Sequence, residues 1–200
     1  MRALLLLVLL SGLVRAGDSE LQMIKSRIAL FATLKGRFTQ SKKIRVIKKP
    51  LKSEGNFVLL KDKGVLWRTF KPRVVSVRVF HDEIAEIKDG RPTVIVSAKD
   101  QPALGLIGKV LFAVFSADIK ELKRHFDFTR AALKDPGGWE VSLRPRDAMI
   151  AKVIDGVEAA GTGTVESLTI HEVNGDVTSI SFSEISSTRP VTTEEAALFE

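Results

Sequence analysis

Short segments with alternating apolar and polar residues, joined by very short connections, restrict how this chain can fold. Turn signals separate the segments at Asp62-Lys63-Gly64, Lys71-Pro72, His81-Asp82 and Asp89-Gly90. Connections of this length cannot contain a crossover helix, so consecutive strands must pair antiparallel as a meander. The strands predicted for this part of the chain are residues 53–61, 65–71, 73–80, 83–88 and 92–97.

Further strands are expected before and after the meander. Residues 38–46 alternate in a way that is typical of a strand with one solvated face. Phe38, Gln40, Lys42, Ile44 and Val46 share one face of this segment. Residues 125–133 and 139–143 form two more predicted strands, joined around Pro136-Gly137-Gly138.

The last predicted hairpin pairs residues 165–172 with residues 177–184 around Asn174-Gly175. A two-residue turn would put Leu168 and Ile170 on the opposite face from Ile180 and Phe182. A three-residue loop with Gly175 in the left-handed conformation puts all four on one face. Because one buried face should dominate the register, we predict the three-residue loop.

Three helices are predicted around these strands. Residues 18–35 carry Leu21, Ile24, Ile28 and Phe31 at helical spacing, with Asp18 or Ser19 as the N-cap and Gly36 at the end. Residues 101–116 form an apolar helix with Pro102 in its first turn, and residues 118–124 form a short one. A helix that is apolar on nearly every side is normally buried.

The amino terminus has the layout of a secretory signal peptide. A positive start at Arg2 precedes an apolar run from Leu4, and Val14-Arg15-Ala16 places small residues at a cleavage site. The apolar run is too short to cross a bilayer as a helix. We expect cleavage near Ala16, a periplasmic location and a soluble single domain over residues 17–200; the alternative is an uncleaved membrane anchor.

Composition narrows the classes of function. The chain contains no cysteine, which excludes disulfides, thiolate metal sites and attachment of lipid to a cysteine. Removal of Arg2 and Arg15 with the signal peptide lowers the formal net charge from +7 to +5. The basic residues are dispersed and only 6% of residues are aromatic, so nucleic acid is not an expected partner.

The sequence contains no recognisable catalytic or metal-binding motif. His81, His125 and His171 are far apart, and His171-Glu172 lacks the second histidine of a zinc-protease helix. Gly161-Thr162-Gly163 precedes neither a helix nor a lysine, as a phosphate loop requires. We therefore expect a protein that is not an enzyme and that uses no metal or cofactor.

A basic run begins within the predicted strand at residues 38–46 and continues beyond it. It consists of Lys42, Lys43, Arg45, Lys48, Lys49 and Lys52. One interpretation is a solvated sheet edge whose charges discourage edge-to-edge pairing. The other is a docking face for an acidic partner or for anionic lipid headgroups.

The order of short motifs along the chain resembles the LolA-type outer-membrane lipoprotein carriers. The motifs are Phe38-Thr39-Gln40, Gly55-Asn56-Phe57, Gly64-Val65-Leu66-Trp67-Arg68 with Lys71-Pro72, Trp139-Glu140-Val141-Ser142-Leu143-Arg144-Pro145 and Asn174-Gly175-Asp176. The resemblance implies an α+β fold, with an open, strongly curved antiparallel half-barrel of about 10–11 strands. Helices would cover its concave face and enclose a lipid-binding cavity.

The resemblance also implies partners, and it has one departure. Carriers of this kind take a lipoprotein from an inner-membrane exporter and pass it to an outer-membrane acceptor. Better-known members have an Arg-Pro pair before the tryptophan strand, whose arginine latches the helical lid. Lys61-Asp62-Lys63-Gly64 stands there in this chain, so no latch residue is assigned, although Arg68 and Arg73 are nearby.

A carrier needs an apolar concavity that can open, because each buried methylene of an acyl chain gains only about 0.8 kcal/mol. Residues that supply apolar side chains to such a cavity, or equally to an ordinary core, are Phe38, Phe57, Leu59, Val65, Trp67, Leu104, Ile107, Leu111, Phe112 and Phe115. We expect a monomeric periplasmic carrier that shields the acyl chains of a lipoprotein or other lipid and makes transient contact with membrane surfaces. The alternative is an envelope binding or scaffold module on the same fold that moves no lipid.

Overall fold

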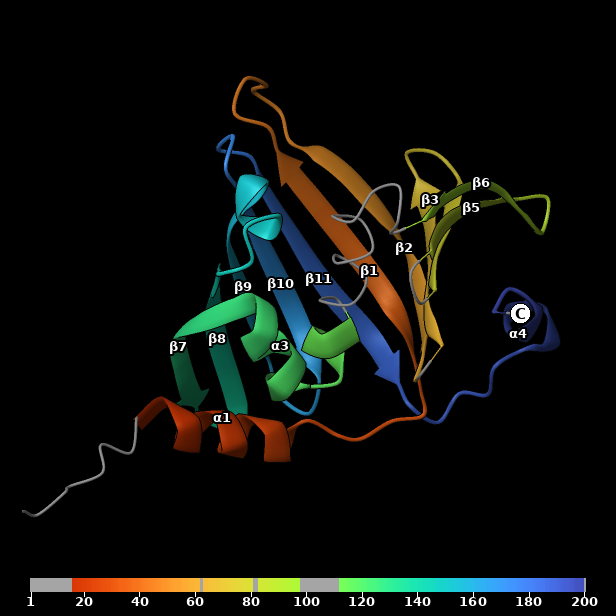
Figure 1. Ribbon diagram of the computed structural model, residues 1–200. Coiled ribbons are helices and arrows are strands. Elements are labelled where there is room, and N and C mark those ends of the chain that lie inside the picture. The colour runs from red at the N-terminus through yellow and green to blue at the C-terminus, as the bar shows by residue number, and fades with distance from the viewer. Residues whose placement is uncertain (1–15, 62, 81–82, 98–111, 200) are drawn as a thin grey trace, which may run out of the picture.

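The strands form one antiparallel sheet of 11 strands, accompanied by short helices (Figure 1). The structure is a computed structural model, and it describes residues 16–61, 63–80, 83–97 and 112–199. The strands follow the order β6-β5-β4-β3-β2-β1-β11-β10-β9-β8-β7 across the sheet. They are β1 (Thr33–Lys43), β2 (Leu51–Leu60), β3 (Gly64–Lys71), β4 (Val75–Phe80), β5 (Glu83–Lys88), β6 (Arg91–Ser97), β7 (Phe126–Lys134), β8 (Gly138–Pro145), β9 (Ile154–Gly161), β10 (Val165–Glu172) and β11 (Val177–Ser186).

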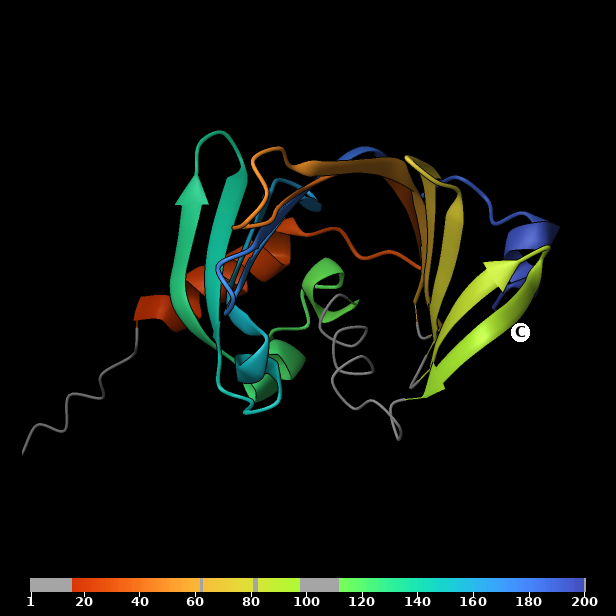
Figure 2. The same ribbon diagram turned by 90° about the horizontal axis from the view of Figure 1, so that it is seen from above.

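The sheet curves into an open U, which confirms the predicted half-barrel (Figure 2). The helical turn at residues 112–115 and helix α3 (Ile119–His125) lie within the U. Helix α1 (Ala16–Arg27) packs beside β7, and helix α4 (Thr193–Ala197) lies outside the U. A short 3-10 helix, η1 (Ile150–Lys152), precedes β9. The predicted α+β fold, with helices against the concave face, is therefore observed.

The bend of the sheet is built from glycine–phenylalanine pairs in its central strands. Gly36 of β1 pairs with Phe57 of β2, and Gly55 of β2 pairs with Phe38 of β1. Irregularities of register lie at both glycines, in the β1–β11 and β2–β3 ladders. Bulges and strand glycines bend a sheet and allow side chains to lie close to the backbone. The two phenylalanine rings can therefore lie over the glycines on the concave face.

Both faces of the central strands are buried. On the concave face, Phe57 and Leu59 belong to the main hydrophobic core with residues of α1 and α3. On the convex face, Val58 and Leu66 form a second, smaller core with Phe199. Successive strand residues point to opposite faces, so Phe57, Val58 and Leu59 of β2 contribute side chains to both cores.

A charged contact fixes α4 against the convex face. Glu195 and Thr192 form a capping box, in which each side chain accepts a hydrogen bond from the other residue's backbone N–H. The Glu195 carboxylate also accepts a hydrogen bond from Lys35 of β1 and lies 3.6 Å from a guanidinium nitrogen of Arg68. The carboxyl-terminal helix is therefore tied to two strands near the centre of the sheet.

Two sequence-based expectations for the amino-terminal third are wrong. The first helix does not extend over residues 18–35: it ends at Arg27, and β1 begins at Thr33. Residues 33–36 pair with β2, which buries Leu34 and satisfies their backbone hydrogen-bonding groups. The spacing of apolar residues along the chain does not reveal this pairing with a distant strand. The basic run is not a sheet edge either, because Lys42 and Lys43 belong to β1, which pairs with β11 on one side and β2 on the other.

The carboxyl-terminal hairpin has the predicted geometry. Leu168 pairs with Ile180, and Ile170 pairs with Thr178. Hydrogen bonding between Glu172 and Asp176 closes a three-residue loop in which Gly175 has a φ of 87°. Leu168, Ile170, Ile180 and Phe182 all face the main core, as a single buried face requires.

Other elements were missed or lie outside the described residues. Strand β9, helix η1 and helix α4 were not predicted; β9 contains two glycines and two alanines, which give a weak strand signal. Of the predicted helix at residues 101–116, the structure describes residues 112–116, and residues 112–115 are helical. The short helix predicted at residues 118–124 is α3, whose N-cap is Asp118.

Replacing Gly55 by alanine should destabilise the bend. A Cβ atom there would lie 1.8 Å from the Arg68 carbonyl oxygen and 2.8 Å from Cε1 of Phe38, so the backbone of β3 would have to move. We expect Gly55→Ala to lower the free energy of unfolding by about 3 kcal/mol, measured by urea denaturation. Gly163→Ala is the matched control, since its Cβ would contact nothing within 4 Å. Equal effects of the two substitutions would contradict the steric explanation.

The attachment of α4 should depend on acid pH. Burial raises the pKa of Glu195. Hydrogen bonds from Lys35 and the Thr192 N–H, together with the charges of Lys35 and Arg68, lower it by more than burial raises it, so the pKa lies below its ordinary value of 4.5. The resulting stabilisation is complete above pH 4.5 and is lost as the pH falls through the lowered pKa of the folded state.

Glu195→Gln should therefore lower the free energy of unfolding by about 1–3 kcal/mol at pH 7 and flatten its decline below pH 4.5. Urea denaturation across the acid range measures both effects. Glu194→Gln changes the formal charge equally at a neighbouring exposed position and is the control. An unchanged acid dependence in Glu195→Gln would show that Glu195 is not the group responsible.

Candidate functional site

An apolar cavity lies on the concave side of the sheet. Its volume is about 240 Å³, just below the range of roughly 300–1,000 Å³ that is typical of small-molecule sites. Gln40 is the one polar residue among the described residues that line it. The lining residues are Gln40, Trp67, Val114, Phe126, Ile150, Ile154, Val157, Leu168, Ile170 and Ile180. Such walls favour hydrocarbon, which needs no hydrogen-bond partner.

A cluster of aromatic rings lies beside the cavity and reaches it through Trp67. The ring centroids of Trp67 and Phe38 are 3.9 Å apart at an interplanar angle of 28°. Phe182 meets Trp67 edge-on at 6.2 Å and Phe115 at 4.9 Å, while Phe57 lies 5.5 Å from Phe115. Pairs in these geometries stabilise beyond the area that they bury. Trp67 is the member of the cluster that also lines the cavity.

The polarity of the concave face changes along β1. Phe38, Gln40 and Lys42 share this face by strand alternation, so the residues become more polar toward the end of the strand. The Lys42 ammonium lies 2.6 Å from a carboxylate oxygen of Glu172, and Thr178 donates to the same oxygen at 3.4 Å. A charged cluster therefore lies beyond Gln40 at one end of the apolar region.

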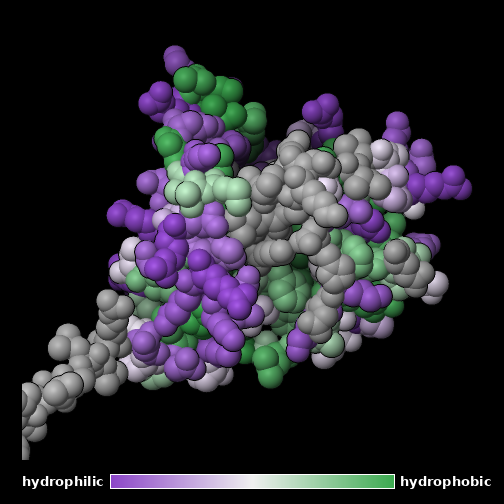
Figure 3. All heavy atoms as spheres, in the orientation of Figure 1, coloured by the Kyte–Doolittle hydropathy of each residue, from purple (hydrophilic) through white to green (hydrophobic). Residues whose placement is uncertain are grey.

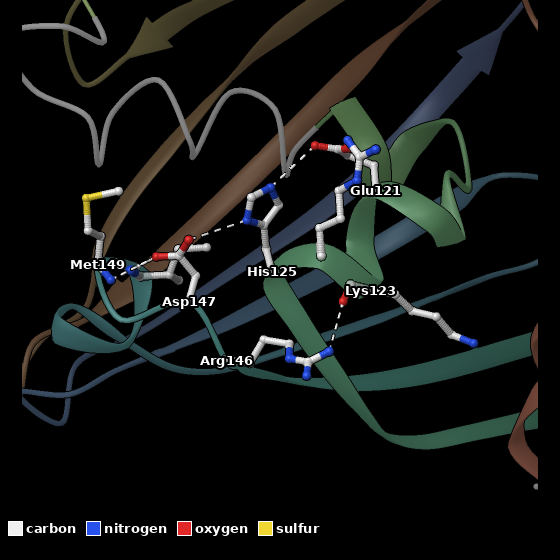
Figure 4. Close-up of polar contacts among 8 residues, drawn as sticks. Glu121, Lys123, His125, Arg146, Asp147 and Met149 are labelled. Atoms are coloured by element: carbon white, nitrogen blue, oxygen red, sulfur yellow. Dashed lines mark hydrogen bonds and ion pairs between the residues drawn. The ribbon is translucent and has the colours of Figure 1, made fainter.

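The segment that carries Ile150 is held by contacts with α3 (Figure 4). His125 lies between two carboxylates, with Nε2 3.3 Å from Glu121 Oε1 and Nδ1 3.5 Å from Asp147 Oδ2. The Met149 N–H donates to Asp147 at 2.8 Å, which is the main reason that the pKa of Asp147 lies below its ordinary value. These contacts connect the short helix inside the U to the segment that places Ile150 in the cavity wall.

The structure places the sequence-predicted cavity residues in two groups. Trp67 lines the cavity. Phe38, Phe57, Leu59, Val65 and Phe115 are almost fully buried in the same core, and Phe112 packs against that core half-buried. Leu104, Ile107 and Leu111 lie outside the described residues. A lipid-binding role for these residues stays a prediction.

Sequence reasoning missed most of the cavity wall. Ile154 and Val157 lie on the unpredicted strand β9, and Ile150 lies on η1. Leu168, Ile170 and Ile180 were assigned correctly to one face of the hairpin but were not proposed as cavity residues. Their alternation was the available signal, but it does not distinguish a packed core from a cavity wall.

Arg68 was noted as lying near the place of the family's latch arginine, but no latch role was assigned to it. Arg68 points to the convex side, where it lies 3.6 Å from Glu195 of α4. Its neighbour Trp67 faces the concave side. Arg68 therefore contributes to the attachment of the carboxyl-terminal helix, on the side of the sheet away from the cavity.

Comparison with solved structures shows the same fold at low sequence identity. A LolA superfamily protein from Nitrosomonas europaea has a TM-score of 0.51 and 9% identity, over 92% of this chain and 96% of that one. A DUF1329 family protein from Desulfovibrio piger has a TM-score of 0.50 and 10% identity, over 92% and 96% of the two chains. No curated protein sequence matches significantly.

None of the helices in the described part of the chain has the length and hydrophobicity needed to cross a bilayer.

The family is shown by the sequence itself. A family model described as "Outer membrane lipoprotein carrier protein LolA-like" matches residues 14–196, which is almost the whole chain. The protein is therefore a member of the LolA-like family.

Proposed function

We propose that the protein is a periplasmic carrier that shields the acyl chain of a lipoprotein or other lipid in the concave cavity and carries it toward the outer membrane. The observation that supports this most directly is the apolar cavity of about 240 Å³, with Gln40 as the one polar residue among its described lining residues. A carrier needs such a surface because an exposed acyl chain is costly in water. Membership of a family described as lipoprotein carriers supports the same function.

The charged end of the concave face gives the lipid an orientation. Hydrocarbon would occupy the space between Trp67 and Ile170, while the polar headgroup would lie near Lys42 and Glu172. Each methylene transferred into the cavity contributes about 0.8 kcal/mol, so binding remains reversible for a chain that is only partly enclosed. Reversibility is what a carrier requires, since it must also release its cargo.

The proposed cleavage site lies before the first residues of the hydrophobic core. We propose that the signal peptide is removed near Ala16 and that residues 17–200 work in the periplasm as one domain and as a monomer. Cleavage there would retain Leu21 and Ile24, the buried side chains through which α1 joins the core. An inner-membrane exporter as donor and an outer-membrane acceptor are the partners proposed for this role, and no catalytic step, metal or cofactor is required.

Binding of a fluorescent fatty acid tests the proposed function. Trp67→Asp and Ile170→Asp each place a charge in the cavity wall, and we expect each to weaken probe binding at least about tenfold. Val74→Asp is the control, because Val74 is an exposed apolar residue at the β3–β4 connection and should leave binding unchanged. Circular dichroism at the assay temperature establishes that each variant is folded.

The co-purified lipid provides a second, independent measurement. Native mass spectrometry of the purified wild-type protein, followed by lipid extraction, should reveal a bound acylated molecule. Absence of bound lipid together with failure to bind the fatty-acid probe would contradict the carrier function. A folded protein with that result would instead fit an envelope binding or scaffold module that moves no lipid.

A further inference from the structure

Three connections meet at one end of the sheet and form a continuous surface. They are residues 43–52, which contain the β1–β2 loop, residues 173–175 between β10 and β11, and residues 149–153, which contain η1, all at the upper end of Figure 1. The Arg45 N–H donates to Asp176 Oδ1 at 2.9 Å, and the Val173 N–H donates to the Val153 carbonyl at 3.1 Å. Hydrogen bonds donated by backbone N–H groups therefore hold the three connections together. We call this surface the basic rim.

The basic rim exposes large apolar side chains. Val46, at the tip of the β1–β2 loop, is 84% exposed, and Val173 on the neighbouring loop is 56% exposed. Exposed apolar residues elsewhere on the rim are Ile47, Leu51, Met149 and Val153. Figure 3 shows a group of hydrophobic atoms near the top of the upper projection, with hydrophilic atoms above and beside them. Several exposed apolar residues at one end of a molecule indicate an interaction site, whereas single ones do not.

Positive charge surrounds these apolar side chains. Residues 43–52 contain five basic residues and no acidic residue. The basic side chains are Lys43, Arg45, Lys48, Lys49 and Lys52, all exposed. Two nearby carboxylates are already engaged: Glu172 pairs with Lys42, and Asp176 is buried and accepts from the Arg45 N–H. The rim therefore presents cations around an apolar tip.

The rim borders the proposed lipid cavity. Ile150 of η1 and Ile154, the residue after Val153, both line the cavity. Gln40, three residues before Lys43, and Ile170, three before Val173, line it from β1 and β10. A surface docked at the rim would therefore lie at the charged end of the concave face.

We propose that the basic rim is a docking surface for an anionic lipid bilayer, with Val46 and Ile47 inserted among the headgroups and acyl chains. Apolar side chains at a projecting tip can enter the interface, while the lysines around them attract anionic lipid. An acidic protein would match the lysines but not a projecting tip of exposed aliphatic side chains. A role of the rim in loading or delivering lipid rests on the proposed carrier function; binding to the bilayer does not.

Vesicle flotation tests the docking surface. The wild-type protein should bind vesicles of phosphatidylethanolamine and phosphatidylglycerol, should bind phosphatidylcholine vesicles far more weakly, and should lose affinity as ionic strength rises. The double variant Lys48→Glu/Lys49→Glu should bind at least about tenfold more weakly, because each basic residue near an anionic surface contributes roughly fivefold in affinity. Lys61→Glu/Lys63→Glu is its control, with the same charge change at exposed positions in the β2–β3 connection.

The apolar contribution has its own pair of variants. Val46→Ser/Ile47→Ser should weaken vesicle binding about tenfold without changing any charge. Leu30→Ser is the control: Leu30 is 91% exposed but precedes β1, at the opposite end of that strand from the rim. In a Val46→Trp variant, the emission of the added tryptophan should shift to shorter wavelength with anionic vesicles and be quenched by brominated lipid.

The outcomes separate this proposal from the carrier function. Absence of flotation with anionic vesicles would overturn the docking surface, as would equal flotation of Val46→Ser/Ile47→Ser and wild type. The lysine variant could lose binding while the emission of the Val46→Trp variant does not shift. That result would indicate adsorption by charge alone, which an acidic protein could equally provide, and would also overturn the docking surface. Binding of the fluorescent fatty acid in solution should be unchanged in all rim variants, so its failure in the wild type would count against the carrier function alone.

Discussion

The structure depends on how phenylalanine rings are accommodated in the first hairpin. Without a side chain at Gly36 and Gly55, the rings of Phe57 and Phe38 lie over the neighbouring strand on the concave face. The rings then stack with Trp67 and form an apolar platform at the bend. A flat sheet could not surround a cavity, and a bend without the platform would expose the glycine backbone. The curvature of the sheet and the aromatic cluster beside the cavity therefore have the same physical cause.

The sequence predicted the fold well where one local pattern decided the structure. In the last hairpin, the three-residue loop follows from placing Leu168 and Ile180 on one buried face, and the structure has this register. Local spacing failed where pairing with distant residues decided the structure: residues 33–35, expected to end the first helix, pair with β2, and Lys35 also pairs with β11. Strand β9 was missed because small residues such as Gly156 and Ala159 give little strand signal, although their neighbours β8 and β10 hold them in the sheet.

The candidate site was less accessible from the sequence. Phe38, Phe57 and Trp67 were predicted together as residues of a cavity or core, and the structure stacks all three on the concave side of the sheet. Alternation cannot show which apolar residues pack completely and which leave space. That depends on curvature, which brings Ile154 and Ile170 opposite Trp67 across the concave face. The convex core was also hidden, because Phe199, which packs with Val58 and Leu66, lies far from both of them in the sequence.

One strand connects the apolar platform to the charged rim. Along β1, the concave side changes from Phe38 through Gln40 to Lys42, and the chain then enters the β1–β2 loop with Val46 at its tip. An acyl chain with a polar headgroup has the same order of polarity, so the strand provides a matching direction for it. The exposed apolar tip beyond the lysines would be costly in water alone, but at a headgroup interface it is stabilised. Cavity and rim together therefore fit a protein that exchanges a lipid at a membrane surface and keeps its hydrocarbon part covered between membranes.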